Sequence, residues 1–97
     1  MRLRGKVDAN HVQIVSELRQ AGCSVISIAD IGDGCGDILV GKSGRTWLFE
    51  IKSSKNSRLT DAELKFMHTW QGQINVIYSA EDALKIIGLL PLEAKRG

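Results

Sequence analysis

Two carboxylates and a lysine are the residues best suited to chemistry in this 97-residue sequence. Glu50 and Lys52 lie two residues apart in an apolar segment, so in a strand both project to one face while Ile51 turns into the core. Asp37 opens the preceding apolar segment. Two acids can hold Mg²⁺ alongside water and a substrate phosphate, and the metal activates a bound water. A lysine beside them orients that water or neutralises the phosphate, so the trio suits phosphodiester hydrolysis.

The same residues also have a purely structural interpretation. Acid-x-lysine spacing is common in strands, so Glu50 and Lys52 could form a surface pair, and Asp37 could cap a turn. Catalysis is favoured by the position of Asp37, at the start of a strand and directly after a glycine-rich loop over residues 31–36.

A hairpin must bring these residues together. A turn at residues 41–44 joins a short strand over residues 37–40 to a longer strand over residues 45–52. Closure at this turn pairs Asp37 with a residue between 46 and 50. Both acids and the lysine then converge at one edge of the sheet.

The remaining segments are predicted to form three helices and two further strands. Apolar residues recur at helical spacing after Asp8, the expected N-cap of the first helix. Thr60 and Glu63 have the spacing of a capping box. In chain order, these elements are a helix over residues 9–21, a strand over 23–28, a helix opened by Thr60, a strand over 74–78 and a helix from 79 to about 87.

This order of elements predicts an α/β fold. We expect a mixed central sheet of about four strands flanked by helices, in the order αβββαβα. The strand over residues 74–78 follows a crossover helix, so it should lie parallel to the strand over 45–52. Ninety-seven residues fit one domain, residues 1–97, with a core over about residues 8–90 and short basic tails.

Composition excludes several classes of protein. The content of 43% hydrophobic and 25% charged residues is ordinary for a soluble globular chain. The apolar runs are too short to span a bilayer, and no signal-peptide pattern is present, so we expect a cytoplasmic protein, in a bacterium or a phage-infected host cell. Cys23 and Cys35 are expected as free thiols. A zinc site built from them with His11 and His68 lacks the usual ligand spacing.

Basic residues cluster at the N-terminus, as Arg2, Arg4 and Lys6, and again in the middle of the chain. The net charge of +2 neither demands nor excludes a nucleic-acid partner. Such clusters are often solvated faces, but they can also neutralise phosphates. We expect DNA-backbone contacts from Lys55, Arg58 and Lys65, which position a duplex without reading its bases.

Three segments resemble the PD-(D/E)xK nuclease superfamily, and within it the small stand-alone VRR-NUC-type domains common in phages. They are Gly-Asp-Ile-Leu-Val at 36–40, Trp-Leu-Phe-Glu-Ile-Lys at 47–52 and Leu-Thr at 59–60. The resemblance covers about residues 8–87 and implies a restriction-endonuclease-like core. It also implies that Mg²⁺ or Mn²⁺ is bound by Asp37, Glu50 and the main-chain carbonyl of Ile51, while Lys52 assists the water.

The chain departs from the family pattern at three places. In the first helix, Asn10 stands about where the family carries a metal-shell glutamate, with Gln13 and Glu17 on a related face. Asn10 is either a weak metal ligand or an ordinary polar residue of the first turn. Gly36 replaces the proline of the family motif. Glu63 stands where the family often has glutamine, and we prefer the capping box as its explanation.

Stand-alone members of this family resemble Holliday-junction resolvases, which act as dimers. The resemblance therefore implies a homodimer. Its apolar surface could come from four residues that more often belong to a core: Trp47, Phe66, Met67 and Trp70. The leading hypothesis is a Mg²⁺- or Mn²⁺-dependent endodeoxyribonuclease that is selective for branched or junction DNA rather than for sequence. The alternatives are a nucleic-acid-binding module with weak or no catalysis on the same fold, and a protein-interaction subunit.

Overall fold

The structure is a computed structural model that describes residues 9–91. This range contains a four-stranded mixed sheet and three α-helices, in the predicted order, with one additional 3-10 turn. The predicted cap Asp8 and the basic residues Arg2, Arg4 and Lys6 lie outside it. The elements are α1 (His11–Gln20), β1 (Ser24–Ser27), η1 (Ala29–Ile31), β2 (Ile38–Lys42), β3 (Arg45–Ile51), α2 (Asp61–Thr69), β4 (Asn75–Ile77) and α3 (Ala80–Ile87).

The sheet has the strand order β1-β2-β3-β4. The first two pairings are antiparallel, and β3 pairs with β4 in parallel, as the crossover through α2 predicted. Within residues 9–91, no helix is long and apolar enough to cross a membrane.

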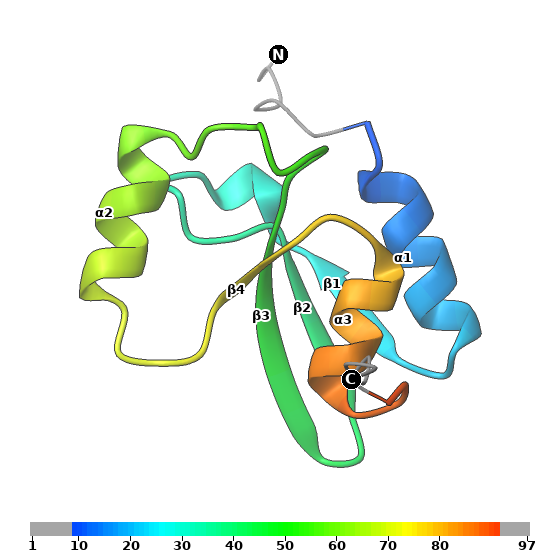
Figure 1. Ribbon diagram of the computed structural model, residues 1–97. Helices are drawn as coiled ribbons and strands as arrows, with labels where there is room; N and C mark the ends of the chain where they lie inside the picture. The colour runs from blue at the N-terminus through cyan, green and yellow to red at the C-terminus, as the bar shows by residue number, and fades with distance from the viewer. Residues whose placement is uncertain (1–8, 92–97) are drawn as a thin grey trace, which may run out of the picture.

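The hydrophobic core lies between one face of the sheet and the pair α1 and α3, which pack side by side (Figure 1). Alternate residues of β3 point into this core, namely Trp47, Phe49 and Ile51. Leu48 and Glu50 therefore point to the opposite face.

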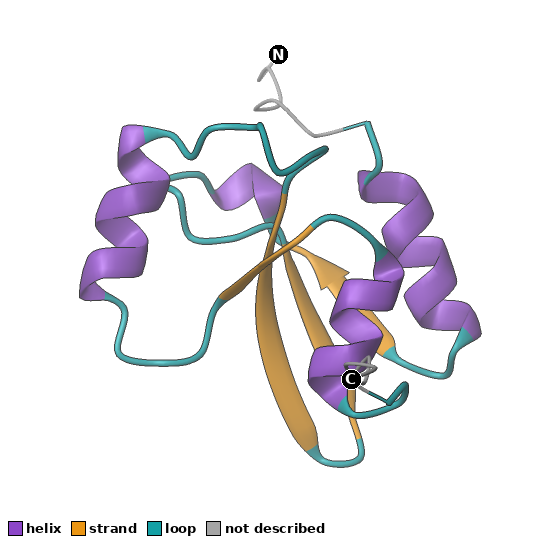
Figure 2. Ribbon diagram, in the orientation of Figure 1, coloured by secondary structure: helices purple, strands orange, loops and turns teal. Residues whose placement is uncertain are grey.

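Helix α2 stands apart from α1 and α3, on the side of that opposite face. It is joined to the sheet by a loop at each end (Figure 2), and none of its residues is buried. Of the four residues considered for a core or a dimer surface, Trp47 is buried in the core, Phe66 and Met67 are half-buried and Trp70 is exposed. The helix thus leaves part of the sheet face uncovered.

The hairpin turn is shorter than predicted. Lys42 pairs with Arg45, so the turn contains only Ser43 and Gly44, which have φ angles of +56° and +79°. Two positive φ angles are typical of the tight turn whose twist matches that of the strands. The ladder runs to the pair Ile38 and Phe49, which places Asp37 next to Glu50 at the end of the expected bracket.

Candidate active site

Asp37 is fixed beside Glu50 by hydrogen bonds to β3. Its N–H donates to the carbonyl oxygen of Phe49 at 2.8 Å, and its Oδ2 accepts from the N–H of Ile51 at 2.6 Å. The side chain thus continues the ladder beyond the last paired residues. Burial raises the pKa of Asp37 above its ordinary value, and the Ile51 N–H offsets this only in part.

Glu50 is a buried acid with 2% of its surface exposed. Burial, a hydrogen bond with Glu63 and the nearby charge of Asp37 raise the pKa of Glu50 to about 9. At neutral pH this carboxyl group therefore keeps its proton and donates it to a neighbouring carboxylate.

Lys52 lies between Glu50 and Glu63. Its Nζ is 2.8 Å from Oε1 of Glu63 and 3.6 Å from Oε2 of Glu50. Burial acts to raise the pKa of Glu63, but hydrogen bonds from Glu50 and Lys52 outweigh it and lower that pKa. Glu63 is thus ionised at neutral pH and holds the ammonium group of Lys52 beside the two other acids.

The capping box of α2 is present as predicted. The N–H of Thr60 donates to Oε1 of Glu63 at 2.8 Å, and the N–H of Glu63 donates to Oγ1 of Thr60 at 3.1 Å. The same Glu63 oxygen also meets Lys52. The capping box therefore accounts for the contact of Glu63 with Thr60 but not for its contact with Lys52. The second contact could not be predicted from the local sequence, because Lys52 comes from another part of the chain.

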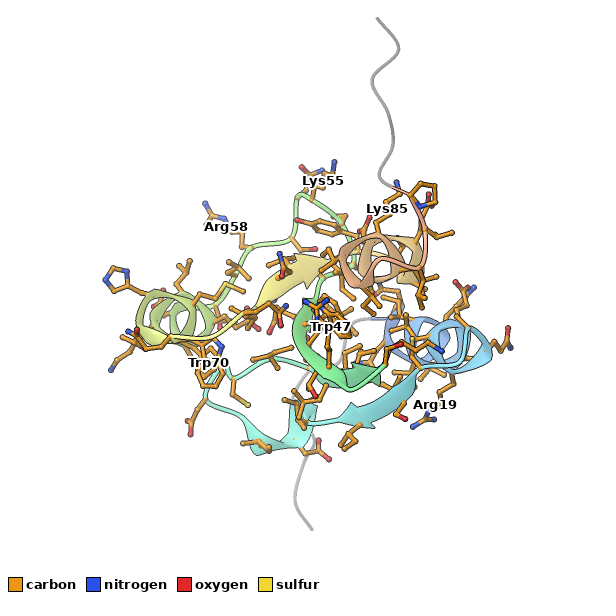
Figure 3. The ribbon with its side chains drawn as sticks, turned by 90° about the horizontal axis from the view of Figure 1, so that it is seen from below. Arg19, Trp47, Lys55, Arg58, Trp70 and Lys85 are labelled. Atoms are coloured by element: carbon orange, nitrogen blue, oxygen red, sulfur yellow. The ribbon has the colours of Figure 1, made fainter. Side chains whose placement is uncertain are left out.

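These side chains border a cavity of about 390 Å³. Of the three residues expected to contact DNA, Arg58 borders this cavity, whereas Lys55 and Lys65 are exposed elsewhere on the surface. Figure 3 shows Lys55 and Arg58 reaching outward from the loop between β3 and α2. The full lining is Asp37, Glu50, Ile51, Lys52, Ser57, Arg58, Thr60 and Glu63.

Two glycines of the loop before Asp37, Gly34 and Gly36, lie too close to neighbouring atoms to carry a side chain. Gly36 has a φ of +106°, and a Cβ there would lie 2.7 Å from Cδ1 of Leu48. Proline requires a negative φ, so it cannot occupy this position in the observed backbone conformation. A Cβ on Gly34 would lie 2.5 Å from the backbone of Ala62. The loop therefore packs directly on the first turn of α2, beside Glu63.

Asn10 contacts the sheet through its amide nitrogen. Its Nδ2 donates to the carbonyl oxygens of Lys52 at 3.1 Å and Tyr78 at 2.9 Å, which ties together the ends of β3 and β4. Its Oδ1 is buried and has no hydrogen-bond partner among residues 9–91. The nitrogen thus has a structural role, and the oxygen remains available to a water or a cation.

The other residues of the first helix divide into two groups. Gln13 and Glu17 bond to each other at 2.7 Å on the exposed face of α1, and neither borders the cavity of Asp37. His11 is 5% exposed, with its Nε2 at 3.1 Å from Oγ of Ser27, and its proximity acts to lower the pKa of Asp37. The sequence offered no signal for this proximity beyond the residue type.

The donor set suits a hard divalent cation in number and chemistry. Cys23 and Cys35 are free, as predicted, and in the described part of the chain no group of three or more His, Cys, Asp and Glu side chains is arranged to hold a metal ion. Mg²⁺, however, usually takes only one or two carboxylates and fills its shell with water and phosphate. Asp37, Glu50 and the main chain of Ile51 all border the same cavity, which is consistent in number with that smaller requirement.

The chain matches no family model, no curated protein and no solved structure. The chemistry of the side chains around Glu50, together with the resemblance in the motif, therefore carries the functional assignment.

Proposed function

We propose that the protein is a Mg²⁺- or Mn²⁺-dependent endodeoxyribonuclease with a restriction-endonuclease-like core. The observation that carries this proposal is the buried Glu50, which lies beside Asp37, Glu63 and Lys52 at the wall of an open cavity. Burying acids together is costly unless positive charge compensates them. A cation that displaces the Glu50 proton supplies that charge.

The residues around the cavity would have different roles in metal binding and catalysis. Asp37, Glu50 and the Ile51 carbonyl would hold the ion, which supplies charge neutralisation and lowers the pKa of a bound water. Lys52, held by Glu63, is placed to orient the attacking water or to neutralise charge on the phosphate oxygens. The guanidinium of Arg58, at the rim of the cavity, suits a phosphate of the same strand.

We further propose branched or junction DNA as the substrate and a homodimer as the active form. Lys55, Arg58 and Lys65 can bind phosphates but carry no arrangement for reading bases, so selectivity for DNA structure is favoured over sequence. Paired cuts across a junction need two active sites related by symmetry.

The second candidate, a nucleic-acid-binding module with weak or no catalysis, is favoured by Asn10. An amide stands there where a carboxylate would strengthen cation binding, and its nitrogen is committed to Lys52 and Tyr78. This candidate requires DNA binding that weakens with salt, without metal-dependent cleavage.

The test is an incubation with four-way junction, flap, duplex and single-stranded DNA, each with divalent metal and with chelator. We expect metal-dependent cleavage by the native protein and a large loss in Asp37→Asn and Lys52→Ala. Glu81 and Lys85 form a matched acid–lysine pair on α3, at 3.4 Å, so Glu81→Gln and Lys85→Ala are the controls. Cleavage of no substrate, or equal cleavage by the site variants and the controls, would refute the nuclease.

A further inference from the structure

An apolar groove lies between α2 and the uncovered face of the sheet, close to the cavity of Glu50 but with no lining residue in common with it. Along α2, Glu63, Phe66 and Trp70 follow one another at helical spacing, so they lie on one side of the helix. Along β3, Glu50 and Leu48 share a face in the same way. The acids thus stand at one end of two facing rows, and the apolar residues follow directly behind them.

The groove has a volume of about 370 Å³, within the usual range of about 300–1,000 Å³ for small-molecule sites. It is lined by Ile28, Cys35, Leu39, Thr46, Leu48, Phe66, Trp70 and Gln73. In Figure 3, Trp70 lies between α2 and the loop that precedes β2. No charged side chain contributes to the lining, in contrast to the neighbouring cavity.

Trp70 is 45% exposed, yet its ring is held on several sides. The ring stacks on Phe66 with a centroid distance of 5.0 Å and an interplanar angle of 22°. Its Nε1 donates to the carbonyl oxygen of Gln73 at 3.2 Å, and a Cβ on Gly72 would lie 2.8 Å from the same nitrogen. An aromatic surface that is exposed but already ordered loses little conformational entropy when a ligand binds.

Thr46 and Gln73 bring a hydroxyl and an amide to the lining, and the amide of Gln73 is already committed. Gln73 accepts from the N–H of Leu48 at 2.7 Å and donates to its carbonyl oxygen at 2.8 Å. In a third bond, at 2.8 Å, Nε2 of Gln73 donates to Oδ1 of Asn75. The groove therefore offers an apolar floor and a stacking surface, without free amide groups to distinguish one base from another.

We propose that this groove binds an unpaired nucleobase of the strand whose phosphate occupies the cavity of Glu50, an inference that rests on the nuclease proposed above. Leu48 and Glu50 are about 7 Å apart along the strand, which is within the reach of a neighbouring nucleotide. Two features favour a base over a second copy of the chain, which would bring no phosphate. Leu48 of the groove and Glu50 of the cavity share one face of β3, and the guanidinium of Arg58 at the cavity is suited to a phosphate. Stacking without polar recognition makes the subsite tolerant of sequence.

The subsite predicts which DNA is cut. A base in the groove must be unstacked from its own helix, so flaps, single strands and junction points are favoured over continuous duplex. Loss of base stacking on an aromatic side chain weakens binding by about 5- to 150-fold. The effect should be confined to substrates with an unpaired base beside the cut.

The test compares Trp70→Ala, Trp70→Phe and the control Leu64→Ala, an exposed α2 residue at 52% that does not line the groove. We expect Trp70→Ala to bind and cut flap DNA at least fivefold more weakly, with duplex binding unchanged. Trp70→Phe and Leu64→Ala should stay close to the native protein. An oligothymidine strand should quench the fluorescence of the native protein much more than that of Trp70→Phe. A single abasic site beside the cut should reproduce the loss without altering the protein.

The outcomes separate this inference from the nuclease itself. Normal cleavage with no effect of Trp70→Ala and of the abasic site would overturn the base subsite and leave the nuclease standing. Quenching by oligothymidine without any cleavage would support the subsite and refute the nuclease. The fluorescence of Trp70 could instead be quenched by rising protein concentration alone, with dimer formation seen in sedimentation. That result would assign the groove to a second copy of the chain and overturn the inference.

Discussion

The proton on Glu50 makes a quantitative prediction for cation binding. Because burial and neighbouring acids raise the pKa of Glu50 to about 9, the carboxyl group is protonated at pH 7. A cation that binds this oxygen must release the proton, so affinity should rise with pH. The raised pKa of Asp37 acts in the same direction, whereas Glu63 has a lowered pKa and contributes no proton.

The size of the effect follows from the pKa. Each pH unit below the pKa of Glu50 costs about 1.4 kcal/mol of binding free energy, a factor of about ten in Kd. Between pH 7 and pH 8 the Kd for Mg²⁺ should therefore fall about tenfold. Between pH 7 and pH 9 the total gain is about 2 kcal/mol, and it levels off above the pKa.

Isothermal titration calorimetry measures both quantities. Titrations with Mg²⁺ at pH 7 and pH 8, in buffers of different ionisation enthalpy, give the Kd and the number of protons released. We expect about one proton for each ion bound. Glu50→Gln should weaken binding and abolish the proton release, whereas Glu81→Gln on α3 should change neither. A Kd that is the same at both pH values, with an enthalpy independent of the buffer, would refute the assignment of this carboxyl group.

Three further substitutions separate catalysis from folding. Glu63→Gln keeps an oxygen for the Thr60 N–H but weakens the ion pair with Lys52. The ammonium group of Lys52 should then be misplaced, so kcat should fall about 10- to 100-fold. An unchanged kcat would contradict this role of Glu63. Thr60→Ala removes the helix cap and should lower the free energy of unfolding, measured by urea denaturation, by about 1 kcal/mol while cleavage persists. Loss of cleavage in a folded variant would show that Thr60 does more than cap α2. Gly36→Ala forces a Cβ against Leu48 at a positive φ and should lower the free energy of unfolding by about 1–3 kcal/mol, whereas no change would exclude strain there.

The positions of Glu50 and Lys52 could be predicted because the two-residue period of a strand decides which side chains share a face. The burial of Ile51 between them follows from the same period. Asp37 could only be bracketed. Glycines at 41 and 44 predicted a longer turn, and a serine at position 43 does not predict a φ of +56°. The register of the hairpin, and with it the partner of Asp37, therefore stayed open.

Glu63 and Trp70 show where sequence reasoning stops. The capping box is a local signal, and it explained Glu63 fully before the fold was known. The contact with Lys52 depends on how the intervening loop returns to the sheet, which no local pattern encodes. In the same way, an aromatic residue of α2 was expected in a core or a dimer surface, and only the packing of α2 beside the sheet shows that Trp70 stays exposed and lines the apolar groove.

The location of a bound cation tests the central claim most directly. Crystals grown or soaked with Mn²⁺ at pH 8.5, measured at the manganese absorption edge, reveal the ion by its anomalous scattering. We expect a peak between the carboxylates of Asp37 and Glu50, within ligand distance of the Ile51 carbonyl, with Lys52 beside it. A fully occupied Mn²⁺ site elsewhere, or an empty position between these two acids at millimolar Mn²⁺, would contradict the proposed metal-dependent nuclease.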